Sequence, residues 1–161
     1  MAGSMRIDPK RIISDTAPAP KAYMSVSITI PGTPPSVNHL YPTLPNGRRV
    51  LSKQGREWKK LVAFHHHRIR RPVVLPPFDI EIRVGRPLNK HGKPCAFADI
   101  SNYIKAVEDA LVDCGMICTD RKVRRVSAER DENIVEPGHT LIVVRHVFLS
   151  SEEKAEAVYS G

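Results

Sequence analysis

Alternation of apolar and polar residues predicts two half-buried β-strands, at Tyr23–Ile30 and at Phe78–Val84. Successive side chains of a strand point to opposite faces of the sheet, so every second position is expected to lie in the core. These core positions are Met24, Val26, Ile28 and Ile30 in the first strand, and Phe78, Ile80, Ile82 and Val84 in the second. A shorter strand is expected at Arg48–Leu51.

A third apolar pattern lies near the end of the chain, where Thr140–Leu149 is almost continuously apolar. Such a run is typical of a strand that is covered on both faces. Val123, Val126 and Ala128 predict one more strand before it, with charged residues on its open face. The last strand is therefore expected to be central in the sheet or paired in a hairpin with Val123–Arg130.

Apolar residues at intervals of three and four predict two amphipathic helices. The first helix follows Ser52, which is expected to cap it. Its expected apolar face consists of Trp58, Leu61, Val62, His65 and Ile69. The second helix lies within Ala98–Gly115, where Asp99 or Ser101 is expected to cap its start and Gly115 to end it. Its apolar residues are Tyr103, Ile104, Val107, Ala110, Leu111 and Cys114.

The order of these elements predicts an α+β fold, a small mixed β-sheet with two main helices packed on it. Residues 1–22 are polar and carry several prolines, and they are expected to form a flexible N-terminal arm. Residues 23–150 are expected to form one folded domain, and residues 151–161 a short charged C-terminal tail. Between the first strand and the first helix, Ser36–Asn46 is expected to be a loop, because prolines end the strand.

The composition favours a polyanionic partner. The 161 residues include 25 Lys and Arg against 17 Asp and Glu, a formal net charge of +8. Lysine and arginine displace counterions from nucleic acid, so a basic surface binds it readily. Three cysteines without a disulfide spacing favour a reducing, cytoplasmic setting, and no apolar run approaches the length of a membrane span.

Candidate catalytic chemistry concentrates around the second helix. Asp120 follows Gly115 closely enough for the chain to fold back and bring Asp120 near the start of that helix. Two carboxylates there, Asp99 and Asp120, with Lys105 one turn inside the helix, suit a hard cation such as magnesium that acts on phosphate. The alternative is that Asp99 and Ser101 only cap the helix and Asp120 only caps a turn.

A run of three histidines, His65–His67, does not predict a metal site. Adjacent residues on a helix point about 100° apart, so three in a row cannot converge on one ion. Cys114 and Cys118 do not change this interpretation, because no paired Cys/His spacing typical of zinc sites is present.

Two motifs stand in order along the chain. One motif reads D-x-[DS]-N-x-x-K-x-x-x-D-A-L and is followed by D-x-x-V. The other motif is SITIPGTPPSVN at Ser27–Asn38, and it is followed by the segment Arg48–Val62. The first motif comprises Asp99, Ser101, Asn102, Lys105, Asp109, Ala110, Leu111, Asp120 and Val123. Together the matches extend from about Val26 to Val147. In this order and spacing they resemble the RusA family of Holliday junction resolvases.

The resemblance implies a RusA-like homodimer that cuts four-way DNA in recombination and repair. It implies that Asp99 and Asp120 hold Mg²⁺, with Mn²⁺ also possible, and that Lys105 stabilises the transition state. Asn102 would orient the helix start or an aspartate. Of the other acidic residues of the helix, Asp109 is expected to form a structural salt bridge. Glu108 is an alternative candidate for an additional acid at the site.

The chain departs from the family pattern at two positions. Ser101 stands where the family commonly has a second aspartate, and it is expected to bind a metal-held water. Thr119 stands where the family commonly has the first of two adjacent aspartates. A hydroxyl is a weaker ligand than a carboxylate, so the alternative function is a branched-DNA-binding protein with an impaired metal site.

Basic and polar residues around this motif are the expected DNA contacts. They are Asn38, Arg86, Lys90, Lys93, Asn102, Arg121, Lys122 and Arg124. The loop Arg86–Ala96 leads directly to Asp99, and the last three basic residues follow Asp120. A basic domain that binds RNA or the ribosome is the remaining alternative. A bacterial host, a phage or a prophage is the expected source of the gene.

Overall fold

The computed structural model describes residues 22–148, so most of the expected arm and all of the expected tail lie outside it. The strands are β1 (Ala22–Tyr23), β2 (Ser25–Pro31), β3 (Val73–Val74), β4 (Phe78–Val84), β5 (Val123–Arg130) and β6 (His139–His146). The helices are α1 (Val37–Leu40), α2 (Lys53–Arg68) and α3 (Ile104–Cys114), with short 3₁₀ helices η1 (Ile100–Tyr103) and η2 (Asp120–Lys122).

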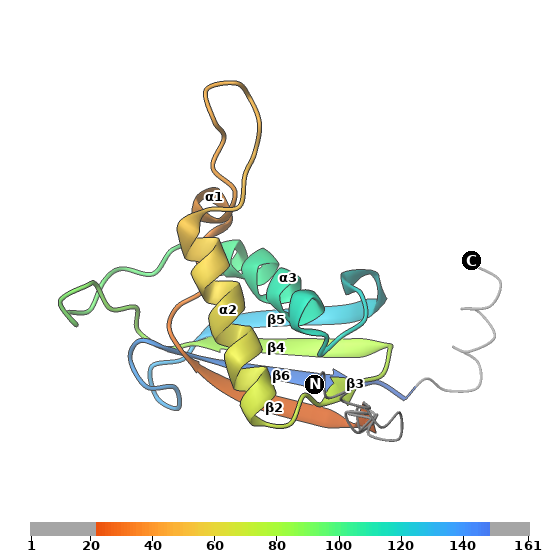
Figure 1. Cartoon of the computed structure of the whole chain (residues 1–161). Coiled ribbons are helices and arrows are strands. Elements are labelled where there is room, and N and C mark those ends of the chain that lie inside the picture. Colours follow the sequence, from red (N-terminus) through yellow and green to blue (C-terminus); the bar gives the residue numbers. More distant parts are fainter. Residues whose placement is uncertain (1–21, 149–161) are drawn as a thin grey trace, which may run out of the picture.

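Four strands form the main sheet, in the order β2-β6-β4-β5. β6 is antiparallel to β2 and β4, whereas β4 and β5 are parallel neighbours. A parallel pair needs a crossover connection, and α3 supplies it on the face of the sheet that α2 also covers (Figure 1). The fold is therefore α+β with a mixed sheet and two main helices, as predicted.

The last strand lies in the middle of the sheet, and the alternative hairpin with the preceding strand is wrong. β5 pairs with β4 and forms an edge. β6 is buried on both faces, because Ile142 and Val144 belong to the core under the helices and Val143, on the opposite face, is only 9% exposed. A central position suits such a strand, while the charged side chains of β5 stay in water at the edge.

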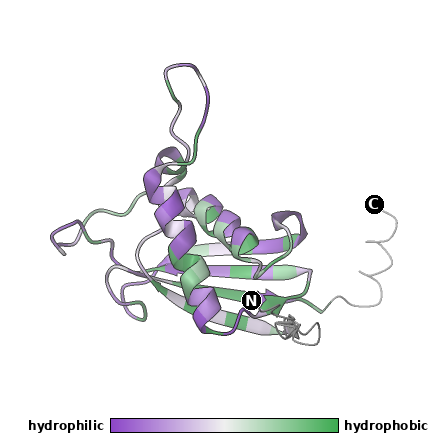
Figure 2. Cartoon of the chain, viewed as in Figure 1, coloured by the Kyte–Doolittle hydropathy of each residue, from purple (hydrophilic) through white to green (hydrophobic). Residues whose placement is uncertain are grey.

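The alternating patterns place the core as predicted, with one exception at the start of β2. All four expected core residues of β4 are buried, and so are Val26, Ile28 and Ile30 of β2. Met24 is 52% exposed, because β2 begins only at Ser25. Hydrophobic residues recur along the strands, whereas the turns of α2 that face the viewer are largely hydrophilic (Figure 2).

The segment between β2 and α2 differs from the predictions. A short helix, α1, lies inside the expected loop, where the backbone N–H groups of His39 and Leu40 donate to the carbonyl oxygen of Ser36. The predicted strand at Arg48–Leu51 is absent, and only an isolated bridge joins Thr43 to Arg49. A single bridge does not make a strand, and the loop between α1 and α2 projects from the body (Figure 1).

The first amphipathic helix begins as predicted but buries a slightly different face. Ser52 caps α2, because its hydroxyl oxygen accepts the N–H of Gly55 at 2.9 Å. Ile69 is 40% exposed, because the helix ends at Arg68, and His66 is buried instead. The His66 Nε2 atom lies 2.7 Å from the carbonyl oxygen of Pro72, a partner that makes burial of this ring tolerable.

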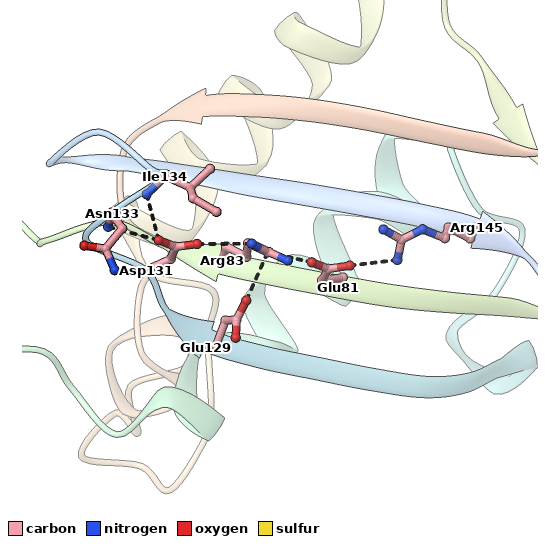
Figure 3. Close-up of polar contacts among 7 residues, drawn as sticks. All are labelled: Glu81, Arg83, Glu129, Asp131, Asn133, Ile134 and Arg145. Carbon is pink, nitrogen blue, oxygen red and sulfur yellow. Dashed lines mark hydrogen bonds and ion pairs between the residues drawn. The ribbon is translucent and has the colours of Figure 1, made fainter.

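The sheet face opposite the helices carries a network of charged side chains (Figure 3). Arg83 lies 2.6 Å from Glu81, 3.0 Å from Glu129 and 3.2 Å from Asp131, and Arg145 contacts Glu81 at 2.7 Å. The Asp131 carboxylate also accepts backbone N–H groups of the β5–β6 connection. These hydrogen bonds, above all the one from Ile134, lower the pKa of Asp131. The network therefore joins β4, β5, β6 and that connection.

Candidate active site

The start of the second helix is shaped by a 3₁₀ turn rather than by the predicted side-chain cap. Asp99 precedes η1, and the carbonyl oxygen of Asp99, not its carboxylate, accepts the N–H of Asn102 at 2.9 Å. No side-chain cap is present at η1 or α3, so the expected capping by Asp99 or Ser101 is wrong. Tyr103 holds this segment instead, since its buried hydroxyl accepts the N–H of Ala98 at 3.0 Å.

Four side chains from three separate segments meet beside the first turns of α3. The Lys105 Nζ atom lies 2.8 Å from Asp109 Oδ1 and 3.2 Å from Asp120 Oδ2. The hydroxyl of Tyr41, just after α1, donates to Asp109 Oδ2 at 2.6 Å. The predicted return of Asp120 to the start of the helix is therefore confirmed, and so is the predicted salt bridge of Asp109.

The return of the chain after α3 has a local cause. Gly115 ends the helix with φ of 81°, a left-handed conformation that side-chain-bearing residues adopt only with strain. Met116 and Ile117 are then fully buried and fix the direction of the turn. Thr119 begins η2 by accepting the N–H of Arg121 at 3.3 Å, which leaves Asp120 on the side of Lys105.

The charges of the cluster stabilise one another. The hydrogen bond from Lys105, and its positive charge, lower the pKa of Asp120. Asp109 first, and Asp120 second, raise the pKa of Lys105 above its usual value, although partial burial opposes this. The carboxylate of Asp109 raises the pKa of Tyr41 to about 12. At neutral pH, Lys105 is therefore an ammonium, Asp120 a carboxylate and Tyr41 a neutral hydrogen-bond donor.

Replacing Tyr41 by Phe should lower the free energy of unfolding by about 1.5 kcal/mol, because it removes a hydrogen bond to a charged group. The raised pKa of Tyr41 means that this contribution is complete below about pH 10, the usual pKa of tyrosine, and is lost as the pH rises through about 12. Urea denaturation at several pH values measures it. Tyr23→Phe is the control, because Tyr23 is exposed and its hydroxyl has no hydrogen-bond partner within the described residues; an equal loss in both variants would contradict the expectation.

Replacing Glu108 by Gln should stabilise the protein at neutral pH. Burial raises the pKa of Glu108, and Lys105 offsets this only in part. Because the folded-state pKa is the higher one, the contribution of Glu108 to stability falls as the pH rises from the unfolded-state pKa through the folded-state pKa. The stability of Glu108→Gln relative to wild type should therefore increase between pH 4 and pH 7, as denaturation curves would show. A difference that does not vary with pH would contradict this assignment.

The cluster contains oxygen donors of the kind that a hard divalent cation binds, but two of them are paired with Lys105. Oxygen atoms of Asp109 and Asp120 already converge on one positive atom, Lys105 Nζ, and carboxylate oxygens are the ligands that magnesium prefers. The exposed Asp99 and Ser101 stand in the segment just before Lys105. Within residues 22–148, no three His, Cys, Asp or Glu side chains form a group that could hold a metal ion. No described contact joins the carboxylates of Asp99 and Asp120.

The expected DNA contacts near the two acids are mostly on the surface. Lys90 and Lys93 are exposed in the loop before Asp99. Arg121 and Lys122 are exposed in η2, directly after Asp120, and Arg124 is exposed in β5. The basic residues of η2 therefore adjoin the Lys105 cluster, as the sequence order indicates.

The remaining expected contacts have other surroundings. Arg86 lies 3.2 Å from Glu132, and its guanidinium lies 5.5 Å from the centre of the Phe97 ring. Asn38 is exposed on α1, and Asn102 is half-buried in η1. The side chain of Arg86 therefore already has protein partners.

Sequence reasoning missed the role of Tyr41. Tyr41 and Asp109 are 68 positions apart, so no local pattern connects them. The ion pair of Lys105 with Asp109 did have a local signal, because residues four apart on a helix are neighbours. The link from Tyr41 through Asp109 to Lys105 is thus a product of the tertiary structure.

The region that contains the Lys105 cluster also matches a known protein family. A family model described as Endodeoxyribonuclease RusA matches residues 31–144. The chain belongs to the RusA endodeoxyribonuclease family. The match extends from the end of β2 into β6, so it includes Tyr41, Asp99 and the whole Lys105 cluster. A comparison with curated proteins gives no significant match.

Membership of the RusA family assigns the chain to the DNA-binding endonucleases that resolve Holliday junctions in recombination. The projecting loop between α1 and α2 and the loop before Asp99 both lie within the matched region. Within the described residues, no helix has the length and apolar character needed to span a membrane.

Proposed function

We propose that this RusA-family chain is a Mg²⁺-dependent endodeoxyribonuclease that resolves Holliday junctions by paired phosphodiester hydrolysis, with Mn²⁺ as a possible substitute. The observation that carries the proposal is the contact of Asp120 with Lys105 beside the segment that holds Asp99. This contact joins Asp120, which begins the second part of the family motif, to Lys105 of the first part.

Asp99 and Asp120 would hold the cation through their carboxylate oxygens, and Ser101 would bind one of its waters. A bound divalent cation supplies positive charge that lowers the pKa of a water and neutralises phosphate. Lys105 would donate a hydrogen bond to the scissile phosphate as negative charge develops there. Asp109 and Tyr41 would position Lys105, because both belong to its hydrogen-bonded chain.

The basic side chains would hold the arms of the junction. Lys90, Lys93, Arg121, Lys122 and Arg124, with Arg86, Asn38 and Asn102, would contact sugar and phosphate on both sides of the acids. We also propose a homodimer, because a four-way junction has approximate two-fold symmetry and two equivalent sites can cut its symmetric strands. A cytoplasmic setting, in a bacterial host or from a phage or prophage gene, completes the proposal.

The test is cleavage of a synthetic four-way junction by the full chain, with Mg²⁺, Mn²⁺ or EDTA. Symmetric nicks that need a divalent cation, and that are absent from a linear duplex of the same sequence, would support the proposal. Equal cutting of junction and duplex, or cutting in EDTA, would contradict it. Sedimentation of the free chain tests the dimer separately.

Replacing Ser101 by Asp should let the enzyme work at a lower Mg²⁺ concentration, by roughly tenfold at half-maximal rate, because it adds a carboxylate where only a hydroxyl stands. Titration of the junction-cleavage rate with Mg²⁺ measures this shift. The matched control is Ser127→Asp, since Ser127 is exposed in the edge strand β5. An unchanged Mg²⁺ dependence in Ser101→Asp would argue against a cation at this position.

A second candidate function is binding of branched DNA without cleavage. The observation that favours it is the pairing of Asp120 and Asp109 with Lys105, together with a hydroxyl at Ser101. Tight junction binding in EDTA, with no nicks under any divalent cation, would support this alternative over the nuclease.

A further inference from the structure

A groove of about 580 Å³ lies beside the segment that carries Asp99. One wall comes from the loop after β2, including Pro35 and Ser36, and a second from α2, including Trp58 and Leu61. The third wall includes Ala98 and Tyr103. Pockets of 300–1,000 Å³ are the usual size for small organic ligands, so the groove has room for a single nucleotide base.

The charge of the groove is unusual for this chain. None of the residues that line it, all of them within residues 22–148, is a lysine or an arginine, although the chain carries a net charge of +8. Its one carboxylate belongs to Glu57, which lies 3.9 Å from Lys53, with both side chains largely exposed. Phosphate binding depends on lysine and arginine, so the groove suits an uncharged part of DNA better than its backbone.

The third wall of the groove is continuous with the candidate active site. Ala98 directly precedes Asp99, and the N–H of Ala98 donates to the hydroxyl of Tyr103 at 3.0 Å. This bond holds the wall and the start of η1 together. A DNA strand with a phosphate at Asp99 would therefore bring the adjoining nucleotide to the opening of the groove.

We propose that this groove receives one unpaired base of the DNA that is bound at Asp99, and that it favours a base with an exocyclic amino group. The inference rests on the proposed function. Glu57 can accept a hydrogen bond from such an amino group, and Gln54 can both donate and accept. Thymine has no exocyclic amino group and can offer the Glu57 carboxylate only its ring N3–H, a single donor in place of the two of an amino group.

The base must be unpaired, because a stacked and paired base does not expose its edge to a groove of this kind. Taking a base out of a duplex costs a few kcal/mol, and the cost is least where the base is already unpaired. Ser36 and His39 both line the groove and are hydrogen-bonded to each other, with Oγ and Nδ1 2.8 Å apart.

The experiment uses the full chain with Asp120→Asn, to keep the DNA uncut, and a four-way junction with 2-aminopurine at the branch point. The expected result is a rise in 2-aminopurine fluorescence on binding, with protection from acrylamide, because the base leaves the stack and enters the groove. Leu61→Trp fills the groove and should abolish both signals. Ala63→Trp is the matched control, because Ala63 is an exposed residue of the same helix outside the groove, and it should retain both.

Glu57→Gln tests the chemistry of recognition. It should reduce the preference for an unpaired adenine over an unpaired thymine at the same position by about tenfold, as measured by binding competition. A preference that does not change in Glu57→Gln would overturn the assigned base class.

Separate outcomes test the groove and the nuclease activity. Fluorescence that does not change, in a junction that wild type binds and cleaves, would overturn the groove and leave the nuclease intact. Signals that persist in Leu61→Trp, with circular dichroism showing a folded variant, would also overturn the groove. Failure of wild type to bind or cut the junction in preference to linear duplex would remove the proposed function, and the groove assignment with it.

Discussion

Replacing Asp120 by Asn is expected to reduce the rate of junction cleavage by about 10²–10³-fold, while the affinity for uncut junction stays the same or rises. The carboxylate of Asp120 is the one acid that the return of the chain brings to Lys105, at 3.2 Å. Asparagine keeps the shape but removes the charge that would hold a cation and balance the lysine. Losses of this size are typical when a group that stabilises transition-state charge is removed.

The matched control is Asp113→Asn. Asp113 belongs to α3 and pairs with Lys59 at 2.7 Å. Asp113→Asn therefore removes an aspartate that is paired with a lysine, as Asp120→Asn does. Single-turnover cleavage with Mg²⁺ and binding in EDTA separate the two effects. Similar rates for the two variants, with both folded, would remove Asp120 from the catalytic residues.

Replacing Lys105 by Met is expected to slow cleavage at saturating Mg²⁺ by about 10²-fold. The raised pKa of Lys105 keeps its ammonium charged at neutral pH, where it can meet negative charge on a phosphate. Methionine retains much of the unbranched apolar stem and loses only the charged end. The loss should appear in the maximal rate, because the interaction is expected to strengthen in the transition state.

Lys59→Met is the control for this variant. Lys59 lies on α2 and pairs with Asp113, so its replacement removes a lysine of similar length and leaves a carboxylate unpaired. Rates at saturating junction and denaturation curves should be compared for both variants. If Lys59→Met slows cleavage as much as Lys105→Met does, Lys105 has no special role at the phosphate.

Local periodicity was sufficient for much of the fold. The bounds of β4 were predicted without error, and Ser52 caps α2 as expected, because both depend on neighbours within a few residues. The position of β6 was harder, since an apolar run indicates burial on both faces but not which strands provide it. The sequence also indicated neither α1 nor the buried His66, whose partner, Pro72, lies beyond the end of the helix.

Part of the candidate site was also accessible from sequence. Lys105 and Asp109 are four residues apart on a helix, and Gly115 signals that the chain turns back toward them. The side-chain cap at Asp99 or Ser101 was predicted wrongly. In the 3₁₀ turn the backbone carbonyl of Asp99 accepts the N–H of Asn102, and both the Asp99 carboxylate and the Ser101 hydroxyl stay exposed to solvent. The contact of Tyr41 with Asp109 joins residues brought together only by the packing of α1 and α2 against α3.

By itself the sequence determined the four strands of the main sheet, the two main helices, the basic charge and a motif specific enough to indicate the family, since each depends on residue types at short range. Only the tertiary structure decided the strand order, the pairing of Lys105 with Asp120 and the groove free of lysine and arginine. Each of these features depends on which segments, far apart in the sequence, pack together. Side-chain volumes and the geometry of the crossover connection determine that packing for the chain as a whole.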